Sequence, residues 1–449
     1  MLASNTTGCE WTRTVKAQAH REVRVGLLGC GVVGGATARM LLENADVVAE
    51  KAGAPVKLAR VAVKDLSRPR SLELPAHLMT DVVSDVAESG DIDIVVETIG
   101  GVDVARHAVM AALSSGKHVV TANKELLAAH GEEIWDCAHA CGVDVFLEAS
   151  VGGGIPVIRP LKESLAGDRV HRVMGILNGT TNYILTRMSE TGETFGEALD
   201  QASRHGYTEL DPAADIEGFD AASKLAILAS LAFRTHVLAA DVEREGIARI
   251  KPSDIAAAHD MGYEIKLLAV AEQEEGQILA QVHPAMVPRS HPLAAVRDVY
   301  NAVFVEAEGA GELMFFGRGA GGDPTASAIV GDIVEAARNV VTGRAFIASR
   351  RLPKRARMRP HDEARVRYYV VLSVVDRPGV LAAVAGAFAK EHISIASVRQ
   401  EGLGDAATLA LITHTATEGQ HRRCFALLEY LDEVQSVSST IRVEGTGES

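Results

Sequence analysis

The N-terminal part of the chain contains a glycine pattern that could bind phosphate. Gly-x-Gly-x-x-Gly ends a short apolar run, residues 23–29, and opens a stretch with helical periodicity. Glycine permits a tight turn and lets the main chain approach a pyrophosphate, and the N-terminus of a helix adds partial positive charge. This context favours a dinucleotide site, although a plain tight turn would use the same glycines. The residues expected to contact the dinucleotide are Gly29, Gly31, Val32, Val33 and Gly34.

The next predicted strand covers residues 58–63. The two charged residues that follow it could determine whether the protein prefers NAD or NADP. An acid at this place accepts a hydrogen bond from the ribose hydroxyl of NAD, whereas a base favours the additional phosphate of NADP. The chain has Lys64 followed by Asp65. Lys64 is a candidate cofactor contact, and both NAD(H) and NADP(H) remain open.

Four further segments are small and polar where predicted strands end. In an open α/β sheet, ligands bind beyond the carboxyl ends of the strands. Thr98 and Lys124 are therefore expected to face a ligand. The four segments are residues 97–101, 121–124, 148–156 and 175–183.

Asp220 and Lys224 are four residues apart, which places both side chains on one face of a helix that begins near Glu217. As an exposed ion pair they would stabilise that helix by only about 0.2–0.5 kcal/mol. The apolar residues that follow, 225–233, favour a packed helix instead.

A turn with several acids precedes this helix. Glu209 and Asp215 could be solvated acids of that turn, and His205 could be a packed or exposed imidazole. His205 is not assigned to catalysis.

The elements that would position these residues form three units. Residues 23–150 alternate strands and helices, which predicts a parallel, doubly wound sheet of the Rossmann type, completed by part of residues 315–345. The predicted strands are 23–29, 58–63, 92–96, 118–121 and 143–148, and the predicted helices include 104–115 and 126–141.

Residues 151–345 are expected to form an α+β unit, to which the family resemblance described below assigns catalysis and dimerisation. A long amphipathic helix, 221–233, accompanies strands at 170–177, 278–284 and 299–307. A second glycine loop, containing Gly321, precedes a helix that includes residues 329–336.

The rest of the chain predicts a linker and a small module. Residues 346–366 are basic and poor in apolar residues; a DNA-binding arm is the alternative to a linker, but aromatic residues are not interleaved. Residues 367–449 read as a βαββαβ module. Its strands are expected at 368–374, 394–400, 408–413 and 437–443, and its helices at 380–391 and 420–431.

Composition excludes several classes of protein. The 449 residues suit three domains of about 150 residues. A net charge of −14 makes nucleic acid and anionic membrane surfaces poor partners. Five scattered cysteines do not make a disulfide framework, and no apolar run reaches the roughly 18 residues of a membrane span. We expect a soluble, cytoplasmic protein with residues 1–22 as a flexible leader.

The order and spacing of these motifs, together with residues 206–215 and 218–224, resemble homoserine dehydrogenase. The resemblance implies reversible NAD(P)H-dependent reduction of L-aspartate 4-semialdehyde to L-homoserine. It assigns Lys224 as the acid/base and Lys124 as a second lysine near the nicotinamide and the reacting oxygen. By the same resemblance Asp220 and Glu209 hold the substrate, and Gly206 and Gly321 lie near the cofactor.

Residues 148–156 resemble the monovalent-cation loop of that family, in which main-chain carbonyls bind sodium. Glu148, Val151, Gly153 and Ile155 match its positions. Hard cations prefer oxygen ligands, and glycines can turn carbonyls inward. A plain turn between domains is the alternative.

The C-terminal module resembles an ACT domain, a regulatory module that binds amino acids. Asp376, Gly379 and Val380 match its ligand turn. The resemblance implies L-threonine as inhibitor and a homodimer or homotetramer, and the alternative is a purely dimerising layer.

Two other functions compete with homoserine dehydrogenase. An aspartate-semialdehyde dehydrogenase would need a cysteine nucleophile, yet residues 148–327 contain none. A catalytically silent nucleotide-binding regulator would not need Lys124, Glu209, Asp220 and Lys224 together.

Overall fold

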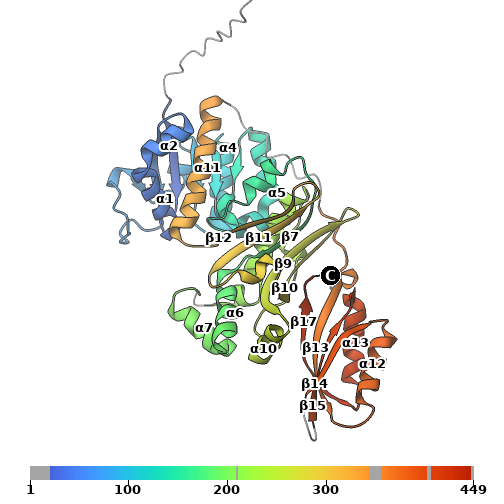
Figure 1. Ribbon diagram of the computed structural model, residues 1–449. Coiled ribbons are helices and arrows are strands. Elements are labelled where there is room, and N and C mark those ends of the chain that lie inside the picture. Colours follow the sequence, from blue (N-terminus) through green and yellow to red (C-terminus); the bar gives the residue numbers. More distant parts are fainter. Residues whose placement is uncertain (1–20, 209–210, 344–354, 402–405, 446–449) are drawn as a thin grey trace, which may run out of the picture.

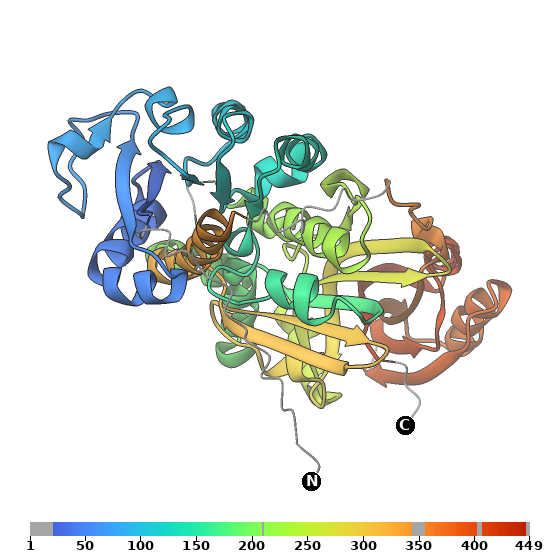
Figure 2. The ribbon, with the colours of Figure 1, turned by 90° about the horizontal axis from the view of Figure 1, so that it is seen from above.

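The computed structural model describes residues 21–208, 211–343, 355–401 and 406–445. An N-terminal unit and a C-terminal module lie at opposite ends of a central unit (Figures 1 and 2). The predicted leader falls outside the described ranges except for its last two residues. Within those ranges no helix is long and apolar enough to cross a membrane.

The N-terminal unit is a parallel sheet of six strands in the order β3-β2-β1-β4-β5-β6. Its central strands consist almost entirely of buried apolar residues, as parallel strands covered on both faces require. The strands are β1 (Val23–Leu28), β2 (Val56–Ala62), β3 (Met79–Thr80), β4 (Ile94–Glu97), β5 (His118–Thr121) and β6 (Val145–Phe146). The helices are α1 (Val32–Glu43), α2 (Ala45–Ala52), α3 (Ser84–Ala87), α4 (Asp103–Ser114) and α5 (Lys124–Cys141).

The strand predicted at 143–148 covers only Val145–Phe146. At Glu148 the main-chain N–H donates to the Asp332 carboxylate at 2.9 Å instead of to a neighbouring strand. The strand therefore stops early, and a short 3-10 turn, Glu148–Ser150, follows it.

Helix α11 (Gly322–Thr342) returns from the central unit and lies beside α1 (Figure 1). Its buried residues Ile329, Ile333 and Ala336 join Val25 and Leu27 of β1 in one apolar core. A segment late in the chain thereby completes the packing of the N-terminal unit.

The central unit contains the strands β12-β11-β7-β9-β10 in that order, all antiparallel. The patterns above do not predict β9 or β12; β9 is buried on both faces, so it lacks the alternation of a half-exposed strand. The strands are β7 (Val170–Ile176), β8 (Glu243–Arg244), β9 (Tyr263–Glu274), β10 (Gln277–Pro288), β11 (Tyr300–Ala307) and β12 (Gly311–Arg318). The helices are α6 (Gly179–Thr191), α7 (Phe195–Arg204), α8 (Ala213–Ile216), α9 (Phe219–Ala232) and α10 (Pro252–Asp260).

The C-terminal module has the predicted βαββαβ order, which confirms the α/β fold class together with the two units above. Its last strand pairs in parallel with β10, so the module and the central unit share one sheet. The described part of the predicted linker also joins this sheet, because Ile278 exchanges main-chain hydrogen bonds with Arg357 and Arg359. The elements are β13 (Arg365–Val375), α12 (Val380–Lys390), β14 (Ile395–Glu401), β15 (Ala406–Thr413), β16 (Ala416–Thr417), α13 (Glu418–Glu429) and β17 (Val434–Val443).

Candidate active site

Two lysines from different units converge on one carboxylate. Lys224 Nζ donates to Asp220 Oδ2 at 2.7 Å, and Lys124 Nζ lies 3.2 Å from Asp220 Oδ1. Lys124 is the first residue of α5, whereas the other two residues lie on α9. The side chains of Asp220 and Lys224 are only 11% and 12% exposed, so they are not a surface ion pair.

Polar groups at the ends of β4 and β5 hold Lys124 in place. Glu97, at the end of β4, is fully buried, and its carboxylate accepts the hydroxyl proton of Thr121 at 2.6 Å. The side chain of Asn123 caps α5 and donates to the main-chain oxygen of Gly101 at 2.7 Å. The predicted polar strand ends are thus bonded to one another. Sequence analysis selected their segments but gave Glu97 and Asn123 no role.

The end of β7 supplies the partners of the α9 side chains. Lys224 Nζ donates to the main-chain oxygen of Leu177 at 2.8 Å. Asn178 Nδ2 donates to Asp220 Oδ2 at 2.9 Å and to Asp215 Oδ1 at 2.6 Å. Asp215 therefore belongs to the cluster, and its interpretation as a solvated turn acid is wrong.

The electrostatics of the cluster favour the ionised forms of Asp220 and Lys124. Burial raises the pKa of Asp220, but Lys224 and Lys124 outweigh it and lower this pKa to about 2. Burial lowers the pKa of Lys124, and the charge of Asp220 more than reverses the effect, so the pKa ends above its ordinary value. Burial raises the pKa of Asp215, and the charge of Asp220 adds to this rise. At neutral pH the triad of Lys124, Asp220 and Lys224 has more positive than negative charge.

The first glycine loop has the shape that a dinucleotide needs. A side chain at Gly34 would collide with the Gly29 carbonyl oxygen and the Thr98 hydroxyl. At Gly31, by contrast, nothing lies within 4 Å of the place a Cβ would take. Gly31 also precedes α1 without a side-chain cap, so N–H groups of the first turn remain available to a phosphate. The residues present therefore fit a dinucleotide.

The second glycine loop lies against the first. Gly321 has φ 121° and directly precedes α11. The next residue, Gly322, packs on Val32 of the first loop, and Asp323 forms an ion pair with Arg39 of α1. The predicted cofactor contacts of both loops are thus brought together.

The buried side-chain amide of Asn301, next to this second loop, was not predicted from the sequence. Asn301 of β11 is 1% exposed, and in the described part of the chain neither its Oδ1 nor its Nδ2 has a hydrogen-bond partner. Its amide fills the space left by the missing side chain of Gly319. One Asn in a strand gives no sequence signal for such a position.

The predicted cation loop offers main-chain rather than side-chain oxygens. The carboxylate of Glu148 already accepts three main-chain N–H groups of residues 157–159 at 2.6–2.9 Å. Val151 and Ile155 are buried, and Gly153 has φ 57°. Within the described ranges, no group of three or more His, Cys, Asp and Glu side chains could hold a metal. The Glu148 side chain is therefore engaged by the protein, and a cation at this loop would have to use main-chain oxygens.

The residues after β2 lie beside the first glycine loop. Lys64 is exposed, whereas the Asp65 carboxylate accepts the main-chain N–H and hydroxyl of Ser67 at 2.8 and 2.7 Å. Arg70 donates to the main-chain oxygen of Asp65. Burial raises the pKa of Cys30 in the glycine loop, and the charge of Arg70 opposes this rise, which places that charge near the loop.

The remaining predicted substrate and cofactor residues lie near the start of α6 or outside the described residues. Gly206 is exposed with φ 73°, and Thr180 Oγ1 donates to the main-chain oxygen of Tyr207 at 2.7 Å. The exposed imidazole of His205 stacks on Tyr207 at 5.6 Å between ring centres. Glu209 lies outside the described residues.

The predicted regulatory residues lie in the C-terminal module, away from the lysines. Gly379 has φ 97° and precedes α12, while Asp376 is exposed in the same turn and Val380 is buried. Figure 1 shows this module at the far end of the central unit from α5.

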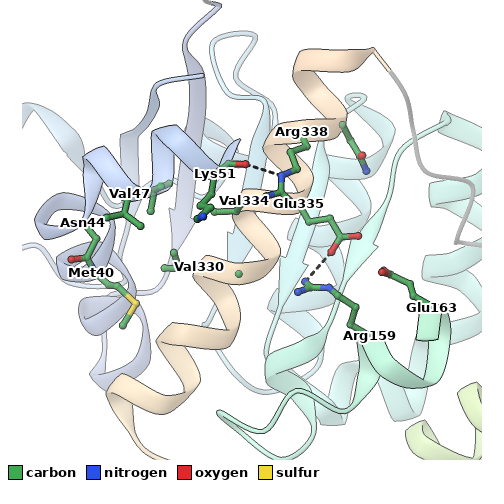
Figure 3. Close-up of a pocket in the computed structure, with 13 residues that line it drawn as sticks. Met40, Asn44, Val47, Lys51, Arg159, Glu163, Val330, Val334, Glu335 and Arg338 are labelled. Atoms are coloured by element: carbon green, nitrogen blue, oxygen red, sulfur yellow. Dashed lines mark hydrogen bonds and ion pairs between the residues drawn. The ribbon is translucent and has the colours of Figure 1, made fainter. Parts of the chain in front are cut away.

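A cavity of about 520 Å³ lies between α2 and α11, where Arg159 and Glu163 of the central unit also line it (Figure 3). Met40, Val47 and Val330 give it an apolar wall, and Arg159 reaches Glu335 at 2.8 Å along its edge. None of the predicted cofactor or substrate residues lines this cavity. This cavity is therefore not the predicted active site, despite its volume.

Comparison with known proteins identifies the family. Family models for homoserine dehydrogenase and its NAD binding domain match residues 156–334 and 29–148, and an ACT domain model matches residues 368–420. The homoserine dehydrogenase of Mycobacterium tuberculosis is 49% identical to this chain over 444 residues, which cover 95% of this chain and 99% of the relative. The chain belongs to the homoserine dehydrogenase family.

Solved structures agree with this assignment. The homoserine dehydrogenase of Thiobacillus denitrificans has a TM-score of 0.90 and 39% identity, and the match covers 95% of this chain and 99% of that chain. A hyperthermophilic archaeal homoserine dehydrogenase in complex with NADPH has a TM-score of 0.60 and 27% identity, and covers 70% of this chain and 97% of that chain.

The predicted activity is confirmed by these relatives. The chain is an NAD(P)-dependent oxidoreductase that interconverts L-aspartate 4-semialdehyde and L-homoserine in threonine and methionine biosynthesis. It carries an ACT domain, whose family model matches residues 368–420 within the predicted module of residues 367–449.

Proposed function

We propose that Lys224 is the acid/base of this reaction, with Lys124 and Asp220 as its partners. The observation that supports this role is the convergence of both lysines on Asp220 across the boundary between two units. An ammonium group has three N–H donors, and Lys224 directs two of them to Leu177 and Asp220. The third is available for the substrate oxygen.

When bound, NAD(P)H supplies the hydride that reduces the aldehyde. Lys224 donates a proton to the alkoxide oxygen that develops on the substrate, and Lys124 stabilises the negative charge of that oxygen. Asp220 binds both ammonium groups and so directs them to one point. Glu209, by resemblance to the family, holds the amino end of the substrate together with Asp220. In the reverse direction Lys224 accepts the hydroxyl proton of homoserine.

Lys224→Arg and Lys224→Ala test this role. Arginine keeps the charge but does not release a proton at neutral pH, so we expect both variants to lose about 10³-fold in kcat for NADPH oxidation with L-aspartate 4-semialdehyde. The KM of Lys224→Arg should change much less than that of Lys224→Ala. A kcat for Lys224→Arg within threefold of wild type would exclude Lys224 as the acid/base.

For the cofactor we propose a preference for NADP(H). The Asp65 carboxylate already accepts two hydrogen bonds from Ser67. In this proposal the charged groups that face the adenosine ribose are therefore the cations Lys64 and Arg70. A cationic pair suits the 2′-phosphate of NADP. Arg70→Ala should raise the KM for NADPH about tenfold and leave the KM for NADH within twofold, as a phosphate contact worth about 1.4 kcal/mol requires. Equal changes for both cofactors would contradict this preference.

We propose further that the loop with Glu148, Val151, Gly153 and Ile155 binds sodium through its main-chain oxygens. The loop lies between the N-terminal and central units, so a cation there would stiffen their boundary. Replacing sodium with choline in the buffer should lower the midpoint of thermal unfolding, and potassium should restore it only in part. An unfolding midpoint independent of the cation would contradict this site.

Regulation and assembly follow from the ACT domain. We propose that L-threonine inhibits the enzyme through this domain, with Asp376, Gly379 and Val380 at the ligand turn, and that the enzyme works in the cytoplasm as a homodimer or homotetramer. L-Threonine should lower kcat of the wild type. Asp376→Asn should weaken that inhibition if the turn holds the amino group of the effector.

A further inference from the structure

The start of β11 lies between two segments that the proposed reaction uses. Asn301, the second residue of β11, pairs with Gly317 of β12, and the next residue pairs with Ile176 of β7. Strand β7 leads to Asn178, which donates to Asp220, whereas β12 leads to the second glycine loop. The start of β11 is therefore placed between the catalytic cluster and the loop that is predicted to contact the cofactor.

The side-chain amide of Asn301 is buried against main chain on two sides. A Cβ on Gly319 would lie 2.1–2.5 Å from the atoms of this amide, and a Cβ on Gly179 would lie 3.6 Å from Asn301 Oδ1. The residue is 1% exposed, and among the described residues neither Oδ1 nor Nδ2 has a hydrogen-bond partner. Because a buried amide without partners is costly, the packing of the described chain does not by itself explain an asparagine here.

The main chain that leads to Asn301 is braced by buried side chains. Asn182 Nδ2 donates to the main-chain oxygen of Asp298 at 2.9 Å and to that of Tyr300 at 3.2 Å. Lys266 Nζ donates to Asn182 Oδ1 at 3.3 Å, so the brace is itself held. The Asn301 amide is therefore fixed in place by the strand that carries it.

The second glycine loop has more conformational freedom than this strand. Three of the four residues 319–322 are glycines, which lack a side chain that would restrict the main chain. A Cβ on Gly153 of the cation loop would lie 2.5 Å from the Gly319 carbonyl oxygen and 2.9 Å from the Ala320 nitrogen. The peptide group between Gly319 and Ala320 thus faces the cation loop. A rotation of this peptide would present its N–H or carbonyl group to the Asn301 amide.

We propose that Asn301 is a positioning residue for the second glycine loop. In the arrangement that receives the dinucleotide, its amide binds main-chain groups of residues 319–320 and holds the loop beside the first one. Gly322 packs on Val32 of the first loop, so a loop held in this way borders the expected pyrophosphate site. The inference rests on the cofactor contact predicted for Gly321.

This role predicts which property of the protein depends on the amide. Without dinucleotide, Asn301 has no hydrogen bond to the described chain, so an apolar side chain of similar shape should not lower the stability of the protein. With dinucleotide, the amide stabilises the loop, so the same substitution should weaken cofactor binding. A purely structural asparagine would behave in the opposite way, with a loss of stability and no specific loss of affinity.

The test compares Asn301→Leu with Asn182→Leu, which makes the same change at a buried asparagine that has protein partners. Thermal unfolding of the full chain without dinucleotide measures stability. The unfolding midpoint of Asn301→Leu should equal or exceed that of wild type, whereas the midpoint of Asn182→Leu should fall by several degrees. A midpoint that falls as far in Asn301→Leu as in Asn182→Leu would overturn the proposal and make Asn301 a structural residue.

Isothermal titration calorimetry measures the affinity for two dinucleotide probes. The Kd of Asn301→Leu for NADPH should be about tenfold above that of wild type, as the loss of one hydrogen-bonded contact predicts. The analogue 2′-phospho-ADP-ribose has the same pyrophosphate but no nicotinamide, so its Kd should rise by a similar factor. A loss of affinity confined to NADPH would mean that Asn301 binds the nicotinamide end directly, and would overturn the role in the loop.

Two further variants separate failure of this inference from failure of the cofactor site. Asn301→Ala removes the amide without pressing on Gly319, and its Kd values decide the test if circular dichroism shows that Asn301→Leu does not fold. Gly321→Ala disturbs the loop itself, because φ 121° is strained for alanine. Unchanged Kd values in the Asn301 variants with a raised Kd in Gly321→Ala would overturn the positioning role alone. Unchanged Kd values in all these variants would also overturn the cofactor contact of the loop.

Discussion

The central unit meets its two neighbours through charge networks of opposite balance. At the catalytic boundary two cations, Lys124 and Lys224, share one carboxylate, Asp220. At the regulatory boundary one cation, Arg442, is shared by two carboxylates, Glu245 and Glu418. Both networks cross from one unit to the next and both are largely buried.

The difference teaches what each network can do. A shared carboxylate leaves N–H donors of the lysines which, in the role proposed for them, stabilise the oxygen of an aldehyde that is gaining charge. At the other boundary two carboxylates bind the Arg442 guanidinium, so this network fixes the ACT domain against the central unit. We therefore expect the first network to matter most for kcat and the second for the contact between the ACT domain and the central unit.

Asp220→Asn should have the largest effect, because it leaves two lysines without their common partner. Removing one member of a buried ion pair costs about 3–5 kcal/mol of unfolding free energy. We expect kcat/KM to fall at least 100-fold as well, since the lysines would repel each other. Urea unfolding and steady-state assays measure the two losses. A stable variant with normal kcat/KM would show that Asp220 does not organise the site.

Arg442→Gln should lower the stability of the protein without a comparable loss of kcat. Glu418 is buried and would lose its cation, so we expect about 3 kcal/mol loss of unfolding free energy. The kcat without any amino acid should stay within threefold of wild type, because Arg442 touches none of the catalytic side chains. Arg297→Gln, which removes an ion pair with Glu190 in which both side chains are exposed, is the matched control with a loss below about 1 kcal/mol. A collapse of kcat in Arg442→Gln alone would mean that the regulatory boundary also organises catalysis.

Local patterns were enough to predict where the Asp220–Lys224 pair and the first glycine loop lie, whereas the catalytic roles came from the family resemblance and stay predictions. The spacing of Asp220 and Lys224 and the glycine loop before α1 depend on neighbours within a few residues, and the structure has both as expected. The fold class follows from the same kind of periodicity. These features are encoded in short stretches of chain, so sequence alone reveals them.

Partners that meet only in space could not be predicted. Arg442 and Glu245 are 197 residues apart, and no periodicity connects them. Asn178 and Asp215 come together only because β7 ends beside α8, and for that reason the sequence could not exclude a solvated Asp215. The shortened β6 depends likewise on Asp332 of α11. The assigned roles of the cation loop and the ligand turn stay predictions.

Acid should weaken the catalytic boundary only when the pH falls toward 2, because the Asp220 carboxylate must be protonated to lose its attraction for the lysines. The pKa of Asp220 is about 2 in the folded chain, against about 3.9 for an ordinary aspartate. Its contribution to stability, on the order of 2 kcal/mol, is therefore complete above about pH 4 and is lost as pH falls toward 2. The difference in unfolding free energy between wild type and Asp220→Asn should shrink over this range. A difference independent of pH would contradict the depressed pKa.

Lys124→Gln should cost the least stability and still impair the enzyme. The Lys124 side chain is 31% exposed and its ion pair with Asp220 is longer than that of Lys224, so its removal should lower the unfolding free energy by only about 1 kcal/mol. If the Lys124 ammonium group stabilises the negative charge of the substrate oxygen, kcat/KM for L-aspartate 4-semialdehyde should nevertheless fall at least tenfold. Lys117→Gln is a poor control, because Lys117 is buried, whereas the exposed Lys57 offers a matched one. A loss of kcat/KM no larger than that of Lys57→Gln would show that Lys124 has only a structural role. The excess of cations at the catalytic boundary would then have no part in the reaction.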